Sequence, residues 1–355
     1  MIAARYTQPG KFAIADAALP AIGEDEILLR VQATVLCGTD VKIVRHGHRK
    51  LRDGQTITLG HEFTGTIEKV GTRVSGYQEG QAVGVAPNIG CGRCEMCAQG
   101  LGNLCPDYQA FGITFDGSHA EFVRIPGEAI RQGNVIPLPA GVSFAEAALS
   151  EPLSCVINAQ RQTRIEIGDT VLVYGAGAMG LLHIMLAAIN GAGRVIAADL
   201  ASTRLEQARR VGATDTILSS TQRVPDWVAA QTGGRGVDVV IIAVPVPALQ
   251  AEALKILAPY GRLCLFAGWA KGVEGVTLDT NPIHYRSLTV TGSTGGAVRD
   301  YAAALRLIAG QRLPVGKIIS DCFDFHHIQE AYDAAMTGER MKVLVTPSGH
   351  TSAQS

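Results

Sequence analysis

The sequence predicts an α/β protein of two domains, one β-rich and one built on a parallel sheet between helices. Its 355 residues exceed what a single hydrophobic core normally supports. Up to about residue 155 the chain is turn-rich with short β runs, whereas beyond about residue 165 apolar strands alternate with helices. This change of pattern predicts a domain boundary between the two regions.

The β-rich domain is expected to combine residues 1–155 with residues 295–355. Short β runs begin near residues 27, 65 and 82, and His119, close to the last run of this lobe, is expected to have a packing role. The later segment is expected to fold back onto the first lobe. It should contain helices at 301–309 and 328–337 and strands at 317–319 and 342–345.

The parallel-sheet domain is expected to span residues 156–294. Its strands follow one another with helices between most of them, which is the pattern of βαβ units. The expected strands are 170–174, 194–199, 216–218, 238–243, 262–267 and 288–292. The expected helices include 178–190 and 202–211, the second with Ser202 as its N-cap.

Composition excludes several classes of function. The net charge of −1 gives no broad basic face, so nucleic acid is not an expected partner. The longest nearly uncharged apolar stretch, residues 171–189, is interrupted by three glycines and indicates strand, turn and helix rather than a membrane span. The N-terminal residues lack the features of a signal peptide. With eight cysteines and no export signal, we expect a cytoplasmic protein whose cysteines bind metal rather than form disulfides.

A glycine loop predicts a dinucleotide site in the second domain. The segment Gly175-Ala-Gly-Ala-Met-Gly180 follows a strand and opens a helix, so backbone N–H groups can approach a pyrophosphate. Asp199 ends the next strand, where its carboxylate would accept ribose hydroxyls and repel a 2′-phosphate, favouring NAD over NADP. Arg204 weakens that preference, and a tight turn without a ligand is the alternative. The expected cofactor-binding residues are Gly175, Gly177, Met179, Gly180, Asp199 and Arg204.

Four cysteines predict a metal site in the first domain. Cys91, Cys94, Cys97 and Cys105 have gaps of two, two and seven residues, which let four thiolates converge on one ion. Four thiolates close a tetrahedral zinc shell and leave no open position, so this zinc should be structural. An iron–sulfur cluster and unrelated free thiols are the alternatives. Flanks without basic character disfavour a nucleic-acid zinc ribbon.

Three separated segments carry further candidate ligands. They are Cys37-Gly-Thr39-Asp40, His61-Glu62 and Glu151-Pro-Leu. Each alone is a weak signal, because an isolated cysteine or histidine is more often packed in a core than bound to metal. Together with the glycine loop and the four cysteines, they form a much stronger signal.

These motifs resemble the zinc-containing medium-chain dehydrogenase/reductase family over essentially the whole chain. Glu151-Pro-Leu stands where alcohol dehydrogenases carry a cysteine ligand, which resembles the polyol branch that includes sorbitol dehydrogenase. Residues 199–205 and 87–95 resemble the same branch, and threonine dehydrogenase shares the form Cys-Gly-Thr-Asp. The resemblance implies a β-rich, GroES-like catalytic domain that binds zinc, and a Rossmann domain that binds NAD.

The resemblance also implies roles for single residues. Cys37 and His61 match zinc ligands, and Glu62 and Glu151 match two carboxylates near that metal, either of which binds directly or through water. Asp40 matches the group that orients the histidine. Thr39 matches the hydroxyl beside the substrate oxygen. The implied catalytic residues are therefore Thr39, Asp40 and Glu62, and two zinc ions per subunit are expected.

The implied reaction is hydride transfer from a secondary alcohol, of a polyol or sugar derivative, to NAD. Zinc would act as a Lewis acid on the hydroxyl. The alternatives are a sugar-phosphate, sugar-acid or threonine-type dehydrogenase and, from another class, a non-catalytic dinucleotide-binding protein. Relatives pair through a strand corresponding to residues 288–292, so the resemblance also implies a homodimer or homotetramer.

Two departures from the family concern the proton path and the substrate. Lys42 stands where many relatives carry the histidine that ends the proton relay, so water, Glu62 or Glu151 would have to substitute. Residues 292–297 lack the Arg-Tyr pair that holds polyol hydroxyls in sorbitol dehydrogenase. A basic cluster follows the first ligand instead, with a solvated loop and an anion-binding loop as the two interpretations. The cluster comprises Arg45, His46, His48, Arg49, Lys50 and Arg52.

Overall fold

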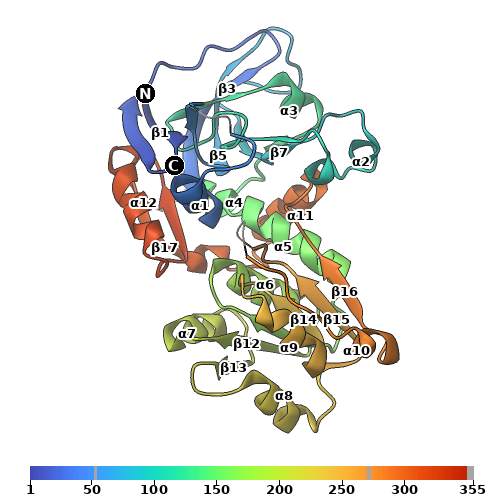
Figure 1. Ribbon diagram of the computed structural model, residues 1–355. Coiled ribbons are helices and arrows are strands. Elements are labelled where there is room, and N and C mark those ends of the chain that lie inside the picture. Colours follow the sequence, from blue (N-terminus) through green and yellow to red (C-terminus); the bar gives the residue numbers. More distant parts are fainter. Residues whose placement is uncertain (52–53, 270–272, 350–355) are drawn as a thin grey trace. The chain divides into compact units, whose positions relative to one another are not determined.

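The computed structural model describes residues 1–51, 54–269 and 273–349 and divides into two compact units (Figure 1). The β-rich unit comprises Met1–Ser154 and Gly295–Ser355, and the parallel-sheet unit comprises Cys155–Thr294. The first break therefore falls after residue 154, where the sequence analysis placed it after residue 155. Arg52 of the basic cluster lies outside the described residues.

The β-rich unit contains three sheets. The largest has the order β10-β6-β5-β3-β18-β17, and β9 also pairs with β3. Its strands are β3 (Ile27–Val35), β5 (Glu62–Val70), β6 (Ala82–Val85), β9 (Phe122–Ile125), β10 (Val135–Pro137), β17 (Ile319–Phe323) and β18 (Lys342–Val345). The smaller sheets join β2 (Lys11–Asp16), β1 (Ile2–Gln8) and β4 (Ile57–Thr58), and β7 (Asn88–Ile89) with β8 (Gln109–Ala110).

Short helices connect these strands. They are α1 (Gly38–His46), α2 (Glu95–Ala98), α3 (Gly127–Arg131), α4 (Phe144–Ala148), α11 (Val298–Ala309) and α12 (Ile328–Met336), with 3-10 turns η1 (Gly102–Leu104), η2 (Val315–Ile318) and η3 (Phe325–His327). The strand expected at 317–319 is wrong, because η2 extends to Ile318 and β17 begins only at Ile319. Val315 and Ile318 are both buried and lie three residues apart, which is the spacing of one face of a 3-10 turn.

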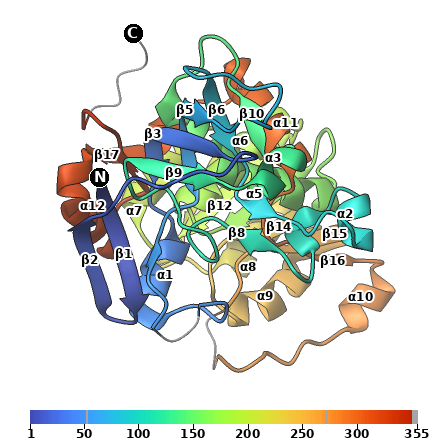
Figure 2. The ribbon, with the colours of Figure 1, turned by 90° about the horizontal axis from the view of Figure 1, so that it is seen from above.

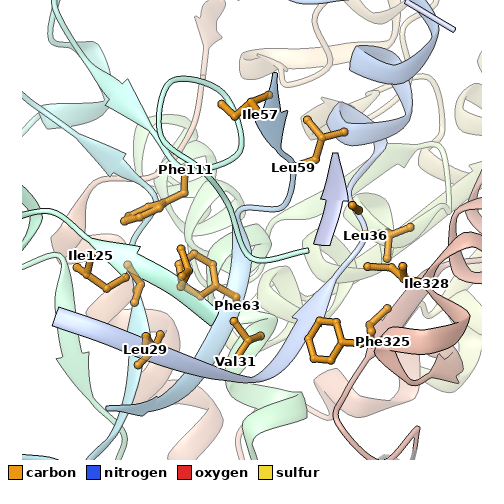
Figure 3. Close-up of a cluster of buried hydrophobic side chains, with 14 of the residues drawn as sticks. Leu29, Val31, Leu36, Ile57, Leu59, Phe63, Phe111, Ile125, Phe325 and Ile328 are labelled. Atoms are coloured by element: carbon orange, nitrogen blue, oxygen red, sulfur yellow. The ribbon is translucent and has the colours of Figure 1, made fainter. Parts of the chain in front are cut away.

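The C-terminal segment belongs to the core of the β-rich unit. Leu29 and Val31 of β3 point to the buried face two residues apart, as a strand with one covered face requires. Figure 3 shows Phe325 and Ile328 packed beside Val31, and all of these side chains are at most 3% exposed. Burial of this many apolar groups explains why residues more than 290 positions apart share one core.

Helix α12 also contacts the first strands of the chain. Figure 2 shows β1 and β2, in dark blue, beside α12, in orange-red. The ring centroids of Phe12 and Tyr332 are 4.3 Å apart. The beginning and the end of the chain are thus joined within one unit.

The parallel-sheet unit has the strand order β13-β12-β11-β14-β15-β16, with all neighbours parallel. Its strands are β11 (Thr170–Tyr174), β12 (Arg194–Asp199), β13 (Asp215–Leu218), β14 (Val237–Ile242), β15 (Leu257–Leu265) and β16 (Thr289–Gly292). The helices are α6 (Ala178–Ile189), α7 (Ser202–Arg210), α8 (Val224–Thr232), α9 (Ala248–Ile256) and α10 (Asn281–Tyr285), and α5 (Ser150–Thr163) leads in from the β-rich unit. This is the doubly wound order of a Rossmann fold, which confirms the expected fold class.

Two details of this unit matter for function. Ala201, not Ser202, occupies the N-cap position of α7, so the expected cap is wrong by one residue. The edge strand β16 exposes most of its residues.

No helix within the described part of the chain has the length and apolar character needed to cross a membrane.

Candidate functional site

The register of the large sheet brings chemically active side chains to one end of β3. Val35, the last residue of β3, has a partner on each side. It pairs with Glu62 of β5 on one side and with Leu344 of β18 on the other. Cys37 follows two residues after Val35 and stands just before α1. Because Lys342 begins β18, Cys37, Glu62 and Lys342 meet at the same edge.

A glycine turn places His61 next to these groups. Gly60 has φ +98°, a conformation that favours glycine, and a Cβ there would lie 2.4 Å from His119 Cδ2. The turn joins β4 to β5, so His61 comes directly before Glu62. Ligand atoms of Cys37, His61 and Glu62 all lie within 4.8 Å of one another, as a metal shell requires.

Asp40 holds the cysteine and the histidine in this arrangement. Its Oδ2 accepts the backbone N–H of Cys37 at 2.9 Å, and its Oδ1 lies 3.4 Å from His61 Nδ1. Burial alone would raise the pKa of this carboxyl, but the charges of His61 and His119 hold it at about 2. The buried carboxylate therefore faces His61 Nδ1 and leaves Nε2 for a metal.

Glu62 is paired with a buried lysine. Lys342 Nζ donates to both carboxylate oxygens of Glu62, at 2.5 and 2.6 Å. Glu62 is fully buried and Lys342 is 3% exposed. Burial opposes the charge of the lysine, but Glu62 and then Cys37 raise its pKa above the usual value. Each carboxylate oxygen has two lone pairs, so this pairing leaves Glu62 able to bind a metal as well.

Glu151 lies near this group without belonging to it. It is 7% exposed in the first turn of α5, and it is absent from the set of ligand atoms within 4.8 Å of one another. Its charge nevertheless contributes to the raised pKa of Lys342. Burial raises the pKa of Tyr301, and Glu151 adds to that shift. Glu151 is thus a second acidic group beside the candidate metal ligands.

Electrostatics shows that the Cys37 site fits a cation. His61 Nδ1 and Asp40 Oδ1 are buried and make no hydrogen bond of normal geometry in the described residues. Burial lowers the pKa of His61, yet Asp40 and Cys37 together raise it well above its ordinary value. Side chains that draw a proton onto a buried histidine would also stabilise a divalent ion. One thiolate, one neutral imidazole and one carboxylate form a neutral shell for zinc.

The first turn of α1 supplies the expected hydroxyl, and the helix continues into the basic cluster. Thr39 is partly exposed, and Lys42, one turn further along, is exposed. Arg45 donates to the Met336 carbonyl at 3.0 Å, and Lys50 donates to the Tyr108 carbonyl. These two cations hold neighbouring segments, which favours a structural interpretation for part of the cluster.

The four cysteines converge as expected. Ligand atoms of Cys91, Cys94, Cys97 and Cys105 lie within 4.8 Å of one another, and all eight cysteines of the chain are free thiols. Hydrogen bonds from the backbone, that of Arg93 first, lower the pKa of Cys91 to about 6, which favours its thiolate. A Cβ on Gly90 would lie 2.4 Å from Cys97 Sγ, so only glycine fits there. The cluster has the donors and the closed geometry of a structural zinc site.

The glycine loop has the geometry of a phosphate cradle. A Cβ on Gly175 would lie 2.3 Å from Val244 Cγ1, and one on Gly180 would lie 1.8 Å from the Gly175 carbonyl oxygen. Those two glycines therefore allow the turn and the close packing of α6 on β11. Gly177 is the N-cap of α6 and has open space at the Cβ position, where backbone can approach a ligand. Met179 is partly buried in the first turn of α6.

Asp199 joins this loop to the next strand. Its Oδ2 accepts the N–H of Ala176 at 2.8 Å, and its Oδ1 accepts the N–H of Ala201 at 3.0 Å. The second bond holds Ala201, the N-cap of α7, beside Asp199. Arg204 Nη1 lies 3.9 Å from Asp199 Oδ2. The structure therefore brings the expected aspartate and arginine together beside the glycine loop.

Lys342 is the residue that the sequence analysis missed. The strand Lys342-Val-Leu-Val is fully buried, and a lysine is almost never found buried unless it is paired. A single charged residue at the start of an apolar strand was the available signal. Only the structure shows that its partner is Glu62, 280 positions away.

Comparisons with known proteins show which family the chain resembles. The family described as "Alcohol dehydrogenase GroES-like domain" matches residues 23–140, and the family described as "Zinc-binding dehydrogenase" matches residues 178–310. A sorbitol dehydrogenase of Bacillus subtilis (strain 168) is 31% identical over 338 residues, covering 93% of this chain and 92% of that relative.

Two solved structures extend the likeness to the whole chain. A protein assigned as a zinc-binding dehydrogenase from Sinorhizobium meliloti 1021, bound to NADP, is 30% identical with a TM-score of 0.88, covering 98% of this chain and 99% of that one. Galactitol-1-phosphate dehydrogenase from Escherichia coli is 28% identical with a TM-score of 0.87, covering 98% of this chain and 100% of that one.

Proposed function

Because this chain belongs to the zinc-binding dehydrogenases of the zinc-containing medium-chain dehydrogenase/reductase family, we propose that its Cys37 site drives the oxidation of a polyol or sugar derivative by NAD. It is an enzyme that acts on CH–OH donors with zinc and a nicotinamide cofactor. The observation that carries the proposal is the convergence of Cys37, His61 and Glu62 beside Asp40, on the fold that the relatives share.

We assign Glu62 as the third zinc ligand. Its carboxylate lies within ligand distance of Cys37 and His61, whereas Glu151 stands outside that group. Lys342 would balance the charge of Glu62 while zinc is bound. Glu151 remains close enough to interact with the same lysine. The structural zinc would be held by Cys91, Cys94, Cys97 and Cys105, giving two zinc ions per subunit.

The proposed mechanism assigns a task to each side chain. When bound, zinc would supply a Lewis acid for the substrate hydroxyl and a nicotinamide would supply the hydride acceptor. Cys37, His61 and Glu62 would hold the metal, and Asp40 would keep His61 in the tautomer that binds it. The hydroxyl oxygen of Thr39 accepts the substrate proton while its own proton passes outward. Lys42 stands where relatives carry the relay histidine, but its side chain is exposed and a lysine is not a relay base near neutral pH, so water would complete the path.

We assign NAD as the preferred cofactor. Gly175, Gly177 and Gly180 would bind the pyrophosphate at the start of α6, with Met179 in its first turn. The carboxylate of Asp199 is fixed by two backbone N–H groups and would repel a 2′-phosphate. Arg204 is close enough to soften that repulsion, which supports a residual use of NADP.

Assembly and location are part of the same proposal. We infer a homodimer or homotetramer formed through the exposed edge strand β16. We infer a cytoplasmic location, because all eight cysteines are free thiols and five of them lie in candidate metal groups.

The test is a substrate screen joined to metal analysis. The purified protein is assayed for NAD reduction with polyols, sugar phosphates and sugar acids, and its zinc content is measured. We expect turnover of at least one polyol and two zinc ions per chain. In Cys37→Ser, turnover and one zinc should be lost while the structural zinc stays. One zinc and no turnover in the parent, or loss of both ions in the variant, would contradict the proposal. Preference for phosphorylated substrates would assign an anion-binding role to the basic cluster.

A further inference from the structure

A buried pair of polar side chains lies behind the turn that carries His61. His119 and Tyr332 are both fully buried, and His119 Nδ1 lies 2.6 Å from Tyr332 Oη. Their rings meet edge to face, with centroids 5.4 Å apart and planes at 86°. Tyr332 belongs to α12, whereas His119 precedes β9, so the pair links the end of the chain to the first lobe.

The imidazole of His119 lies directly against Gly60. A Cβ at Gly60 would be 2.4 Å from His119 Cδ2 and 2.7 Å from His119 N, so the ring covers this glycine closely. The backbone N–H of His119 donates to the Leu59 carbonyl at 2.8 Å, and that of Ser118 donates to the Gly60 carbonyl at 3.1 Å. Side chain and backbone therefore hold the two residues that precede His61.

The hydrogen bond joins two uncharged rings. Burial lowers the pKa of His119, although Asp40 opposes that shift. Burial, followed by the charge of Asp40, raises the pKa of Tyr332. Both rings are therefore uncharged, and Nδ1 and Oη share one hydrogen bond whose donor is set by the imidazole tautomer. Rotation of the ring would break this buried bond, so the bond fixes the orientation of the imidazole.

We propose that His119 and Tyr332 form a buried clamp that fixes the Leu59–Gly60–His61 turn and so sets the position of the zinc ligand His61. This inference rests on the proposed function, because it takes His61 as a ligand. His119 and Tyr332 are positioning residues, since neither belongs to the group of metal ligands. The clamp makes retention of the catalytic zinc depend on α12, which lies beyond both segments matched by the family patterns.

The test measures zinc release from the full-length protein into an excess of a chromogenic chelator. Cys37→Ser identifies the phase that belongs to the catalytic zinc, and the other phase reports the four-cysteine site. In Tyr332→Phe we expect catalytic zinc to leave roughly tenfold faster. This is the lower end of the range by which metal affinity falls when a hydrogen-bond partner outside the ligand shell is lost. Release from the four-cysteine site should be unchanged. Tyr77→Phe is the matched control, because it removes a tyrosine hydrogen bond to the Val135 carbonyl in the same unit.

Two further variants separate positioning from stability. In the double variant His119→Phe/Tyr332→Phe neither polar partner remains, so the urea midpoint should return toward that of the parent. Catalytic zinc should still leave quickly, because the larger phenyl ring presses on Gly60. In His119→Asn the amide oxygen stands near the place of Nδ1 and can accept the phenol proton. Because the hydrogen bond is kept, the rate of zinc release should stay within about threefold of the parental rate.

The outcomes distinguish this clamp from the proposed function. If the parent lacks any zinc phase that Cys37→Ser abolishes, the proposed function fails. If the parent shows that phase but Tyr332→Phe releases zinc at the parental rate, only the clamp is wrong. The clamp is also wrong if release rates follow the urea midpoints across all variants, since the pair would then act through stability alone.

Discussion

At the scale of single residues, the third zinc ligand is the sharpest question that the structure raises. Glu62 lies with Cys37 and His61, and Glu151 stands apart from them. We expect Glu62→Gln to lower zinc affinity at the Cys37 site on the order of 100-fold or more, beyond the effect of losing an outer partner. Zinc content after dialysis should fall from two ions to one. Glu151→Gln should keep both ions, and the reverse result would move the ligand role to Glu151.

We expect cofactor choice to depend on one carboxylate. Asp199 accepts N–H groups from Ala176 and Ala201, which fix its carboxylate beside the glycine loop. In Asp199→Ala we expect kcat/KM with NADP to rise by roughly tenfold relative to NAD, which corresponds to about 1.4 kcal/mol of relieved repulsion. The matched control is Asp215→Ala on β13, whose carboxylate pairs with Arg194 instead. An unchanged ratio in Asp199→Ala would remove Asp199 as the selector.

A buried histidine predicts how stability varies with pH. His183 of α6 is fully buried, and burial lowers its pKa to about 3. In the unfolded chain the pKa is about 6.5, so only the unfolded state binds this proton between those values. The contribution of His183 is therefore present above about pH 6.5 and is lost progressively as the pH falls toward 3.

The measurement uses fluorescence, because both tryptophans of the chain lie in the parallel-sheet unit with His183. Between about pH 6.5 and about pH 5, the parent should lose about 2 kcal/mol more free energy of unfolding than His183→Leu. Equal pH slopes in urea unfolding of the two proteins would show that His183 is already accessible to protons in the folded state.

At the scale of elements, the parallel-sheet unit was predictable because its signals are local. Apolar strands, the glycine loop and Asp199 follow one another in sequence, and the structure places them in the expected order. The β-rich unit was harder, because its pairings join distant segments. The 3-10 turn η2 has the same apolar residues as a strand, and only the spacing of Val315 and Ile318 distinguishes it.

The candidate site shows the same division. Cys37, His61 and the four cysteines carry recognisable residue types and spacing, and the structure groups them as metal donors. Lys342 and Tyr332 could not be assigned from sequence, because their roles depend on partners more than 200 positions away. Burial of a lysine or tyrosine becomes meaningful only when the opposing carboxylate or imidazole is known.

The ion pair between Glu62 of β5 and Lys342, the first residue of β18, gives a prediction about stability. In Lys342→Met the Glu62 carboxylate is left buried without its partner, which should cost about 3–5 kcal/mol of unfolding free energy. The matched control is Arg30→Met, which breaks the exposed Arg30–Glu68 pair between β3 and β5. That change should cost at most about 1 kcal/mol.

Urea unfolding followed by circular dichroism measures both variants, with zinc held at the same concentration. Adding Glu62→Leu to Lys342→Met removes the unpaired charge and should recover much of the loss. Equal costs for Lys342→Met and Arg30→Met would mean that Glu62 finds another partner or takes up a proton.

At the scale of the whole molecule, the N-terminal and C-terminal segments of the chain pack in the same β-rich unit. Candidate zinc ligands come from residues 37–62, while Lys342 and Tyr332 come from the last two elements. Phe325 and Ile328 bury their side chains in the same core as β3. We therefore expect zinc binding in this unit to require the C-terminal segment.

The edge of the parallel sheet predicts how chains assemble. Val290 on β16 is 36% exposed. Tyr260 of the neighbouring strand β15 is 79% exposed, and Tyr285 of α10, the helix before β16, is 80% exposed. An exposed edge strand offers unpaired backbone N–H and C=O groups, and exposed aromatic side chains are typical of interfaces. Pairing of β16 with its copy would join two six-stranded sheets across a two-fold axis.

Val290→Lys places a charge at the centre of that edge and should prevent pairing, because a charged side chain would be buried against its own copy. Light scattering should report a mass near that of one chain for the variant and at least twice that mass for the parent. Ile167→Lys is the matched control, since Ile167 is a 92% exposed apolar residue of the same unit away from β16. A parent that is already a single chain, or a Val290→Lys variant that keeps the parental mass, would exclude assembly through β16.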